Sequence, residues 1–201
     1  MLEADDSMYV AAVVSDMPAE GVTAVNWLAD QGLDEYNIIH IQGLMGSDAQ
    51  VGRTGALDAK VDAEANWNYV TQQTAAWDEE TARTITQTVI DGGKSFNVIY
   101  AENDGMARGA VAALDANGIT HGKDGDVIVM GFDSDKWAFE AVLEGQWNYM
   151  GLCNPLQAET VDGIIKDLMA GNAPSQKVIY TPEQGFDAAT ITQDDVNTYG
   201  T

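Results

Sequence analysis

The stretch NVIYAENDGMARGAVAALDANG, residues 97–118, contains one complete strand-to-helix unit. Apolar residues fill its start up to Ala101, which predicts a strand over residues 97–101 that is buried on both faces. A helix is predicted over residues 103–117 and ends before Gly118, a residue type that commonly follows a helix. Its small or apolar positions return at helical spacing: Met106, Ala107, Ala110, Val111 and Leu114.

The same alternation of strand and helix continues along the chain. Further strands are predicted over residues 9–14, 37–42, 66–72, 126–131, 148–152 and 177–180, and further helices over 19–30, 78–90 and 155–170. Strands that alternate with helices form right-handed βαβ units. The sequence therefore predicts an α/β fold, with a mainly parallel twisted sheet and helices on both of its faces.

Composition excludes several classes of function. The chain has 201 residues, with 9 Lys and Arg against 32 Asp and Glu, and a formal net charge of −23. A chain this acidic, without a basic run, is not an electrostatic binder of nucleic acid or of anionic membranes. The acidity fits either ordinary solvated surface charge or a salt-adapted or surface-exposed environment. No apolar run is long enough to span a membrane, and the start MLEADD shows no signal peptide.

Motifs that carry catalysis or bind metals are absent from the sequence. It has no Gly-x-Ser-x-Gly, His-Glu-x-x-His or Cys-x-x-Cys motif, and its single cysteine, Cys153, permits no internal disulfide. The run DGGKS, residues 91–95, looks like a phosphate-binding loop, but it follows a predicted helix and precedes a strand, the reverse of what that loop requires. We therefore expect no catalytic residues, no metal site and no cofactor.

Polar and aromatic side chains follow successive predicted strands, where each strand leads into the next helix. Parallel strands bring these ends to one edge of the sheet, where such sheets bind ligands. Amide, carboxylate and guanidinium groups bond pairs of sugar hydroxyls, and a Trp ring covers the C–H face of a sugar. The sequence therefore predicts a site for a small sugar or polyol. Its expected residues are Arg53, Trp77, Asn103, Asp104, Asp133 and Asn154.

Five of these residues also have a purely structural interpretation. Asn103, Asp104 and Asp133 are residue types that begin helices as N-caps. Arg53 also fits a surface ion pair with one of the many carboxylates, and Trp77 fits ordinary packing. Their occurrence together at successive strand ends favours the binding site over the separate structural roles.

The segments around these residues resemble the type I periplasmic sugar-binding proteins, the ribose- and galactose-type solute-binding subunits of ABC importers. The order and spacing of the segments agree over nearly the whole chain. They are VSD at 14–16 followed by Gly21, GLMG at 43–46 followed by Arg53, WD at 77–78, AENDGMARGA at 101–110, VMGFD at 129–133 and CNP at 153–155.

The resemblance implies ligand contacts at Arg53, Asn103 and Asp133, with Trp77 as the stacking ring, and Asn154 is a further candidate beside Cys153. Asp104 belongs to the predicted site through the Asn-Asp pair that begins a helix. The sequence departs from the family pattern in two places. Ala56-Leu57 stands where the family usually has Gly-Phe, and Cys153 stands where some members have Gln.

The resemblance also implies a division of the chain. Family members have two lobes joined by three crossovers, and this chain begins near the first crossover. Residues 1–153 are expected to form the C-terminal lobe, residues 154–185 a crossover helix and strand that belong to the other lobe, and residues 186–201 a closing segment. Most of the N-terminal lobe would then be lacking. We expect the helix at 155–170 to expose its apolar face unless it packs against a second copy of the chain or is rearranged.

The implied function is sugar binding for an ABC importer, without enzymatic activity. In the full protein two lobes close on the sugar, and the closed form docks on a membrane permease outside the cytoplasm. A single lobe is expected to bind sugar weakly or undetectably, because half of the walls are lacking. One alternative is the effector-binding domain of a lac-repressor-type transcription regulator, with a helix-turn-helix upstream. Another is a glycosidase that uses Asp104 and Asp133.

Overall fold

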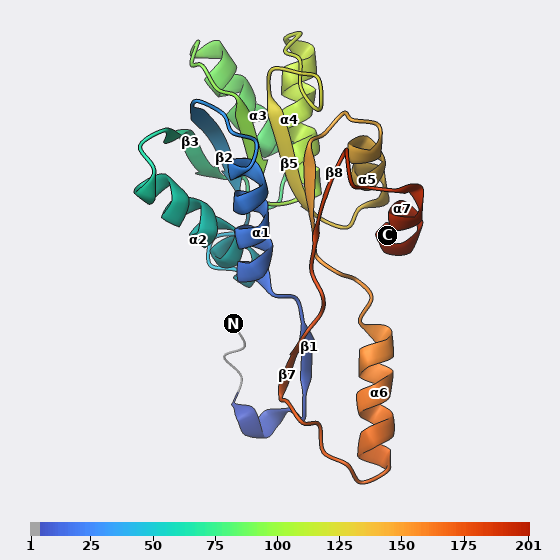
Figure 1. Ribbon diagram of the computed structural model, residues 1–201. Helices are drawn as coiled ribbons and strands as arrows, with labels where there is room; N and C mark the ends of the chain where they lie inside the picture. Colours follow the sequence, from blue (N-terminus) through green and yellow to red (C-terminus); the bar gives the residue numbers. More distant parts are fainter. Residues whose placement is uncertain (1–4) are drawn as a thin grey trace.

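The computed structural model describes residues 5–201 and consists of a large lobe and a thinner extension (Figure 1). The first four residues, on which the expectation about a signal peptide partly rests, lie outside the described residues. The large lobe holds a six-stranded sheet, and the extension holds a two-stranded sheet, one α-helix and a short 3-10 helix, Asp6–Met8. The α/β architecture predicted from the sequence is confirmed.

The six-stranded sheet has the order β3-β2-β4-β5-β6-β8 and is parallel except at one edge. The antiparallel strand is β8, which pairs with β6. In chain order the strands are β2 (Tyr36–Gln42), β3 (Trp67–Thr74), β4 (Val98–Ala101), β5 (Ile128–Asp133), β6 (Tyr149–Leu152) and β8 (Gly185–Asp187).

Helices cover both faces of this sheet. On one face lie α1 (Met17–Ala29) and α2 (Asp48–Ala63), and on the other lie α3 (Glu79–Asp91), α4 (Asp104–Ala116), α5 (Lys136–Leu143) and α7 (Gln193–Tyr199). Side chains of the central strands alternate between two hydrophobic cores, one on each face of the sheet. Val98 and Tyr100 of β4 pack towards α1 and α2, whereas Ile99 and Ala101 pack towards α3 and α4. All four residues are fully buried, as a strand covered on both faces requires.

Three chain crossovers join the lobe to the extension, whose main elements are β1 (Ala12–Val14), β7 (Val178–Tyr180) and α6 (Ala158–Met169). β1 and β7 form a parallel pair. Backbone bonds tie the crossovers together: Thr181 N–H donates to Val14 O at 2.9 Å, and Leu152 N–H donates to Gln184 O at 2.8 Å. No described helix is long and apolar enough to cross a membrane.

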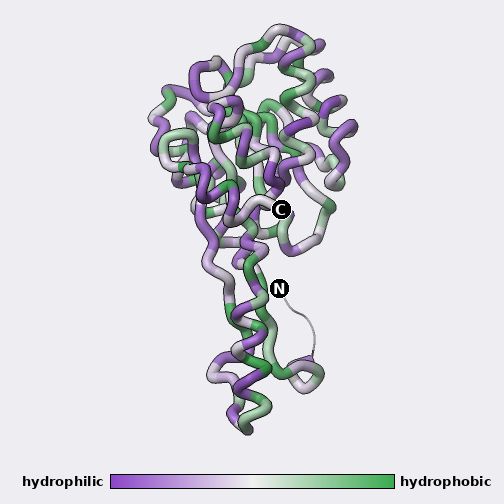
Figure 2. The backbone as a smooth tube through the Cα atoms, turned by 90° about the vertical axis from the view of Figure 1, so that its right-hand side faces the viewer, coloured by the Kyte–Doolittle hydropathy of each residue, from purple (hydrophilic) through white to green (hydrophobic). Residues whose placement is uncertain are grey.

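The helix of the extension, α6, has no buried residue. Its apolar side chains repeat at helical spacing and lie open, with Ile165 50% and Met169 85% exposed. Figure 2 shows apolar segments running through this narrow extension as well as through the centre of the lobe. A helix of this length without tertiary packing is only marginally stable in water.

Local signals placed most elements within a few residues. The helix predicted at 19–30 begins earlier, at Met17, because the Asp16 carboxylate caps it by accepting from Ala19 N–H at 3.1 Å. Three helices of the lobe, α2, α5 and α7, and the short strand β8 were not given bounds by the sequence. α2 has Gly52, Gly55 and several polar residues along its length, which weaken its apolar periodicity.

We predict that α6 exchanges its amide hydrogens at least about a hundredfold faster than β4 and β5 in dilute protein, because only the strands are buried. Hydrogen exchange followed by NMR measures both in one sample, and a rise in α6 protection with concentration would report packing between copies. Protection of α6 equal to that of β4, in a sample that light scattering shows to be strictly monomeric, would contradict this account.

Candidate functional site

The candidate site lies at the edge of the sheet where the parallel strands end. β6 leaves the lobe at this edge and leads towards α6, so the edge faces the extension (Figure 1). The loops that follow β2, β3, β4 and β5 meet here and enter α2, α3, α4 and α5. This is the position at which parallel sheets bind ligands.

Arg53 of α2 is the centre of the site. Its side chain is only 1% exposed, yet each of its nitrogens has a partner. Nε donates to Glu20 Oε2 at 2.8 Å, one terminal nitrogen donates to Asp133 Oδ1 at 2.8 Å, and the other donates to the backbone oxygen of Glu102. The guanidinium carbon also lies 4.8 Å from the centre of the Phe132 ring. A buried cation needs such partners to offset the loss of water.

Two glycines bring the ion pair of α1 and α2 together. A Cβ on Gly21 would lie 2.7 Å from Gly52 O, and a Cβ on Gly52 would lie 2.5 Å from the backbone carbon of Met17. The two helices therefore approach at a distance that only glycine permits. Because Glu20 precedes one glycine and Arg53 follows the other, this contact sets the two charged residues side by side.

Asp133 ends β5 and turns its carboxylate to Arg53. Its φ of +103° is a backbone conformation that residues with a Cβ rarely adopt, and such strain is held by surrounding contacts. One of these contacts is Cys153 N–H, which donates to Asp133 O at 3.0 Å. Burial raises the pKa of Asp133, and the Arg53 guanidinium opposes that shift. The side chain is 42% exposed, and its Oδ2 has no hydrogen bond within residues 5–201, so it faces the edge as an open acceptor.

Asn103 caps α4 and still keeps a donor for a ligand. Its Oδ1 accepts from Met106 N–H at 2.8 Å, which is the N-cap role. Its NH2 group makes no hydrogen bond in the described part of the chain, and the residue is half-buried at the edge. The structural and the binding interpretation of Asn103 are therefore compatible.

Asp104 lies behind the edge and is fully buried. Its Oδ2 accepts from Asp135 N–H at 3.1 Å, which fixes the loop after β5, while its Oδ1 has no partner among the described residues. Burial, with Asp133 nearby, raises the pKa of Asp104 well above its usual range. This carboxyl supports the loop that carries Asp133 and has no surface to offer a ligand.

Trp77 lies in the neighbouring loop, after β3. Ala76 and Trp77 both have left-handed backbone angles, with φ of +51° and +70°. The turn folds the indole ring over Gly43, where a Cβ would lie only 1.8 Å from the ring. Thr74 Oγ1 donates to Gly43 O, which joins this loop to the one after β2. The ring is half-buried and lies against the loop between β2 and α2, the helix that carries Arg53.

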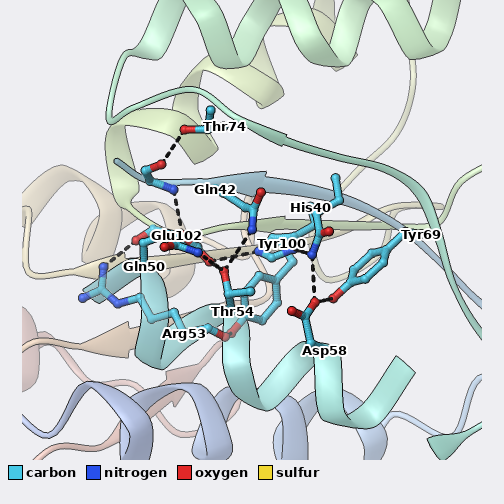
Figure 3. A network of polar contacts seen from close by, with 12 residues as sticks. His40, Gln42, Gln50, Arg53, Thr54, Asp58, Tyr69, Thr74, Tyr100 and Glu102 are labelled. Carbon is cyan, nitrogen blue, oxygen red and sulfur yellow. Dashed lines mark hydrogen bonds and ion pairs between the residues drawn. The ribbon is translucent and has the colours of Figure 1, made fainter. Parts of the chain in front are cut away.

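Another buried carboxylate, Glu102 directly after β4, bonds the loop after β2 and the helix α2 (Figure 3). It accepts from Gly43 N–H at 2.7 Å and from the Thr54 hydroxyl, and it lies 3.0 Å from His40 Nε2. Gln72 Nε2 lies 3.2 Å from His40 Nδ1, which leaves the Nε2–H of the ring to donate to Glu102. The network locks the loop after β2 to the end of β4.

Asn154, like the buried Asp104, does not present its side chain at this edge. It lies in the crossover after β6, where Nδ2 donates to Pro182 O at 2.8 Å and Oδ1 accepts from Leu156 N–H at 2.9 Å. Nδ2 therefore joins two crossovers, whereas Oδ1 makes a local turn within its own crossover. Arg53, Asn103 and Asp133 come together at the edge, with Trp77 in the adjoining loop.

Sequence reasoning did not identify Glu20 and Glu102. Glu20 carried a signal, because it shares the apolar stripe of α1 with Ala24 and Leu28 at spacings of four, and all three are buried. Glu102 follows directly on the apolar run of β4. Within residues 5–201 no group of three His, Cys, Asp or Glu is arranged to hold a metal ion.

Comparison with known proteins identifies the family. Residues 2–173 match the family model described as a periplasmic binding protein domain, so the chain belongs to this family. It is 32% identical over 128 residues to the fructose import binding protein FruE of Bifidobacterium longum, a match that covers 63% of this chain and 38% of that protein. It is 23% identical over 189 residues to the galactofuranose-binding protein YtfQ of Escherichia coli, covering 89% of this chain and 59% of that one.

Solved structures agree with this assignment. A Mycobacterium smegmatis protein in complex with β-D-fucofuranose superposes with a TM-score of 0.81 and 26% identity, over 94% of this chain and 62% of that one. The arabinose transporter component of Shewanella sp. ANA-3, at 24% identity, shares the fold with a TM-score of 0.85. The matches to FruE and YtfQ cover 38% and 59% of the length of these curated relatives. These matches give no support to the transcription-regulator alternative.

We predict that Asp104→Asn stabilises the protein at about pH 8 by about 1–3 kcal/mol, because the buried carboxyl lacks one partner. The raised pKa of Asp104 determines how the stability difference between the two proteins changes with pH. The stability that the protonated group contributes is complete below its usual pKa and is lost as pH rises, whereas Asn does not titrate. Urea unfolding of both proteins, with the exposed Asp124→Asn as control, should show an advantage that grows with pH. An advantage that is constant from pH 4 to pH 8 contradicts the prediction.

We predict that Gly43→Ala displaces the Trp77 ring, because the added Cβ would overlap it, at a cost of about 1–3 kcal/mol. The indole N–H signal of Trp77 in an NMR spectrum reports the displacement. Gly55→Ala is the matched control, since a Cβ there meets nothing within 4 Å and should stabilise α2 slightly. An unmoved Trp77 signal in Gly43→Ala would show that the ring does not lie over Gly43.

Proposed function

We propose that the chain is the sugar-binding lobe of the solute-binding component of an ABC importer. One observation carries the proposal. At the edge of the sheet an open carboxylate oxygen of Asp133 lies in the same site as the free NH2 group of Asn103. A sugar hydroxyl both donates and accepts, so it needs an acceptor and a donor together.

The ion pair gives this site its rigidity. Arg53 is bound to Asp133 and is itself fixed by Glu20 and Glu102, so the carboxylate is oriented before any sugar arrives. Preorganised polar groups cost less to order on binding. In the free chain Arg53 is almost completely buried, so it acts on a sugar through Asp133. The half-buried ring of Trp77 supplies an apolar surface for a C–H face.

The edge forms one wall of the site. The fructose, galactofuranose and ribose import proteins that match this chain are longer, and we propose that a second lobe supplies the opposite wall. The two walls close on the sugar, and the closed form docks on a membrane permease outside the cytoplasm. We propose no catalysis, because Asp104, the partner acid that a glycosidase would use with Asp133, is fully buried behind the edge.

The proposal is tested by NMR titration of the isotope-labelled chain with neutral pentoses, hexoses and inositols. We expect saturable shifts at the Asn103 side-chain amide and the Trp77 indole, with a dissociation constant of about 1–50 mM, because a single wall buries little of the ligand. Asp133→Asn should weaken binding about tenfold. Asp135→Asn, in the same loop but without a side-chain cap bond, should leave it unchanged.

Two results would contradict the proposal. One is the absence of shifts at the edge with every sugar up to about 100 mM, a concentration at which even very weak contacts register. The other is micromolar affinity of the chain by calorimetry, which would mean that the described wall suffices alone.

A further inference from the structure

Glu20 is a buried carboxylate that is bound on one side only. It lies in the first turn of α1 and is 2% exposed. Its Oε2 accepts from Arg53 at 2.8 Å, whereas its Oε1 has no hydrogen-bond partner among the described residues. Burying a carboxylate with one oxygen unpaired lowers the stability of the fold. We therefore expect Glu20 to have a specific role.

The groups that face Glu20 come from every element packed around it. Arg53 on α2 is the one cation among them. β6 contributes the Tyr149 hydroxyl, which is buried and without a partner in residues 5–201, and which also interacts with Asp187 of β8. The remaining neighbours are acids or weak acids: Asp133 of β5, and Cys153 and Glu183 of the crossovers.

These surroundings make the charge of Glu20 easy to change. Burial raises the pKa of Glu20 to about 7, with Glu183 and Asp133 adding to the shift and Arg53 opposing it. The carboxyl therefore gains or loses its proton near neutral pH. Protonation removes the charge that the Nε–H of Arg53 faces and leaves Asp133 and the Glu102 backbone oxygen as the remaining partners of the guanidinium.

We propose that Glu20 is the positioning residue of the sugar site: as a carboxylate it holds the Arg53 guanidinium in the orientation that presents Asp133 at the edge, and on protonation it lets that orientation relax. The role is indirect, because Glu20 is buried behind Arg53 and touches no ligand. Its link to sugar affinity rests on the proposed function, whereas its hold on Arg53 does not.

The sign of the pH effect follows from this arrangement. Above its pKa, Glu20 is ionised and the chain of contacts Glu20–Arg53–Asp133 is complete. Below it, the link between Glu20 and Arg53 weakens, so the site loses order. Sugar affinity should therefore fall by about three- to tenfold as pH drops from 8 to 6, a change of the size that one charge-assisted hydrogen bond makes.

The test compares the unmodified chain with Glu20→Gln, and uses the exposed Glu140→Gln as control. The first readout needs no sugar: the Nε–H signal of Arg53 in an NMR spectrum, followed from about pH 6 to pH 8. We expect it to titrate with a midpoint near 7 in the unmodified chain and in the control, and to stay flat in Glu20→Gln. The second readout is the dissociation constant of the best sugar, which should depend on pH in the same two proteins only.

Several outcomes would overturn the proposal. An Arg53 signal that titrates unchanged in Glu20→Gln would assign the effect to another group, Asp133 or Asp104. A flat Arg53 signal in the unmodified chain would show that Glu20 does not release it. If Glu20→Gln fails to fold, the carboxyl carbon signal of Glu20 in the unmodified chain must share its midpoint with the Arg53 signal, and different midpoints reject the link. A chain in which Arg53 titrates as expected but no sugar binds would reject the proposed function and leave the positioning role of Glu20 intact.

Discussion

The burial of one guanidinium among carboxylates is the constraint on which the site depends. Arg53 is removed from water almost completely, so it must be neutralised locally, and it bonds oxygens of α1, of β5 and of the residue that follows β4. In this way one side chain ties together three elements that are distant in sequence. The close contact of Gly21 with Gly52 is what allows α1 and α2 to supply the first two charges.

The parallel sheet explains why this constraint yields a binding edge. Parallel strands end on the same side, so the residues that leave β2, β3, β4 and β5 form one continuous rim. Buried Glu102 locks the β2 loop to the end of β4, and Thr74 fixes the β3 loop to Gly43. The rim is therefore rigid, with its unpaired donor and acceptor already in place. The crossovers around Asn154 lie next to it, and they are the segments that a hinged closure would bend.

Local sequence signals predicted much of this arrangement. The apolar run of β4 and the capping Asn103 defined a strand-to-helix unit, and parallel topology then placed Asn103 and Asp133 at the same edge. The role of Glu20 depends on its contact with Arg53, and the orientation of the Asn154 side chain depends on its contact with Pro182. Both contacts join segments far apart in the chain, so no local pattern predicts them. β8 has only three residues, too few to show a period. The left-handed turn at Trp77 accompanies the packing of its ring over Gly43, and neither Ala76 nor Trp77 is a residue type that predicts such a turn.

A double-mutant cycle on Glu20 and Arg53 tests the central claim most directly. The cycle compares the free energies of unfolding, at about pH 8, of the unmodified chain, Glu20→Gln, Arg53→Met and the double variant. A buried pair that assembles the site should show a coupling of about 2 kcal/mol, with the double variant less destabilised than the sum of the single ones. A coupling within about 0.3 kcal/mol of zero would mean that the two residues act independently, and would contradict the account.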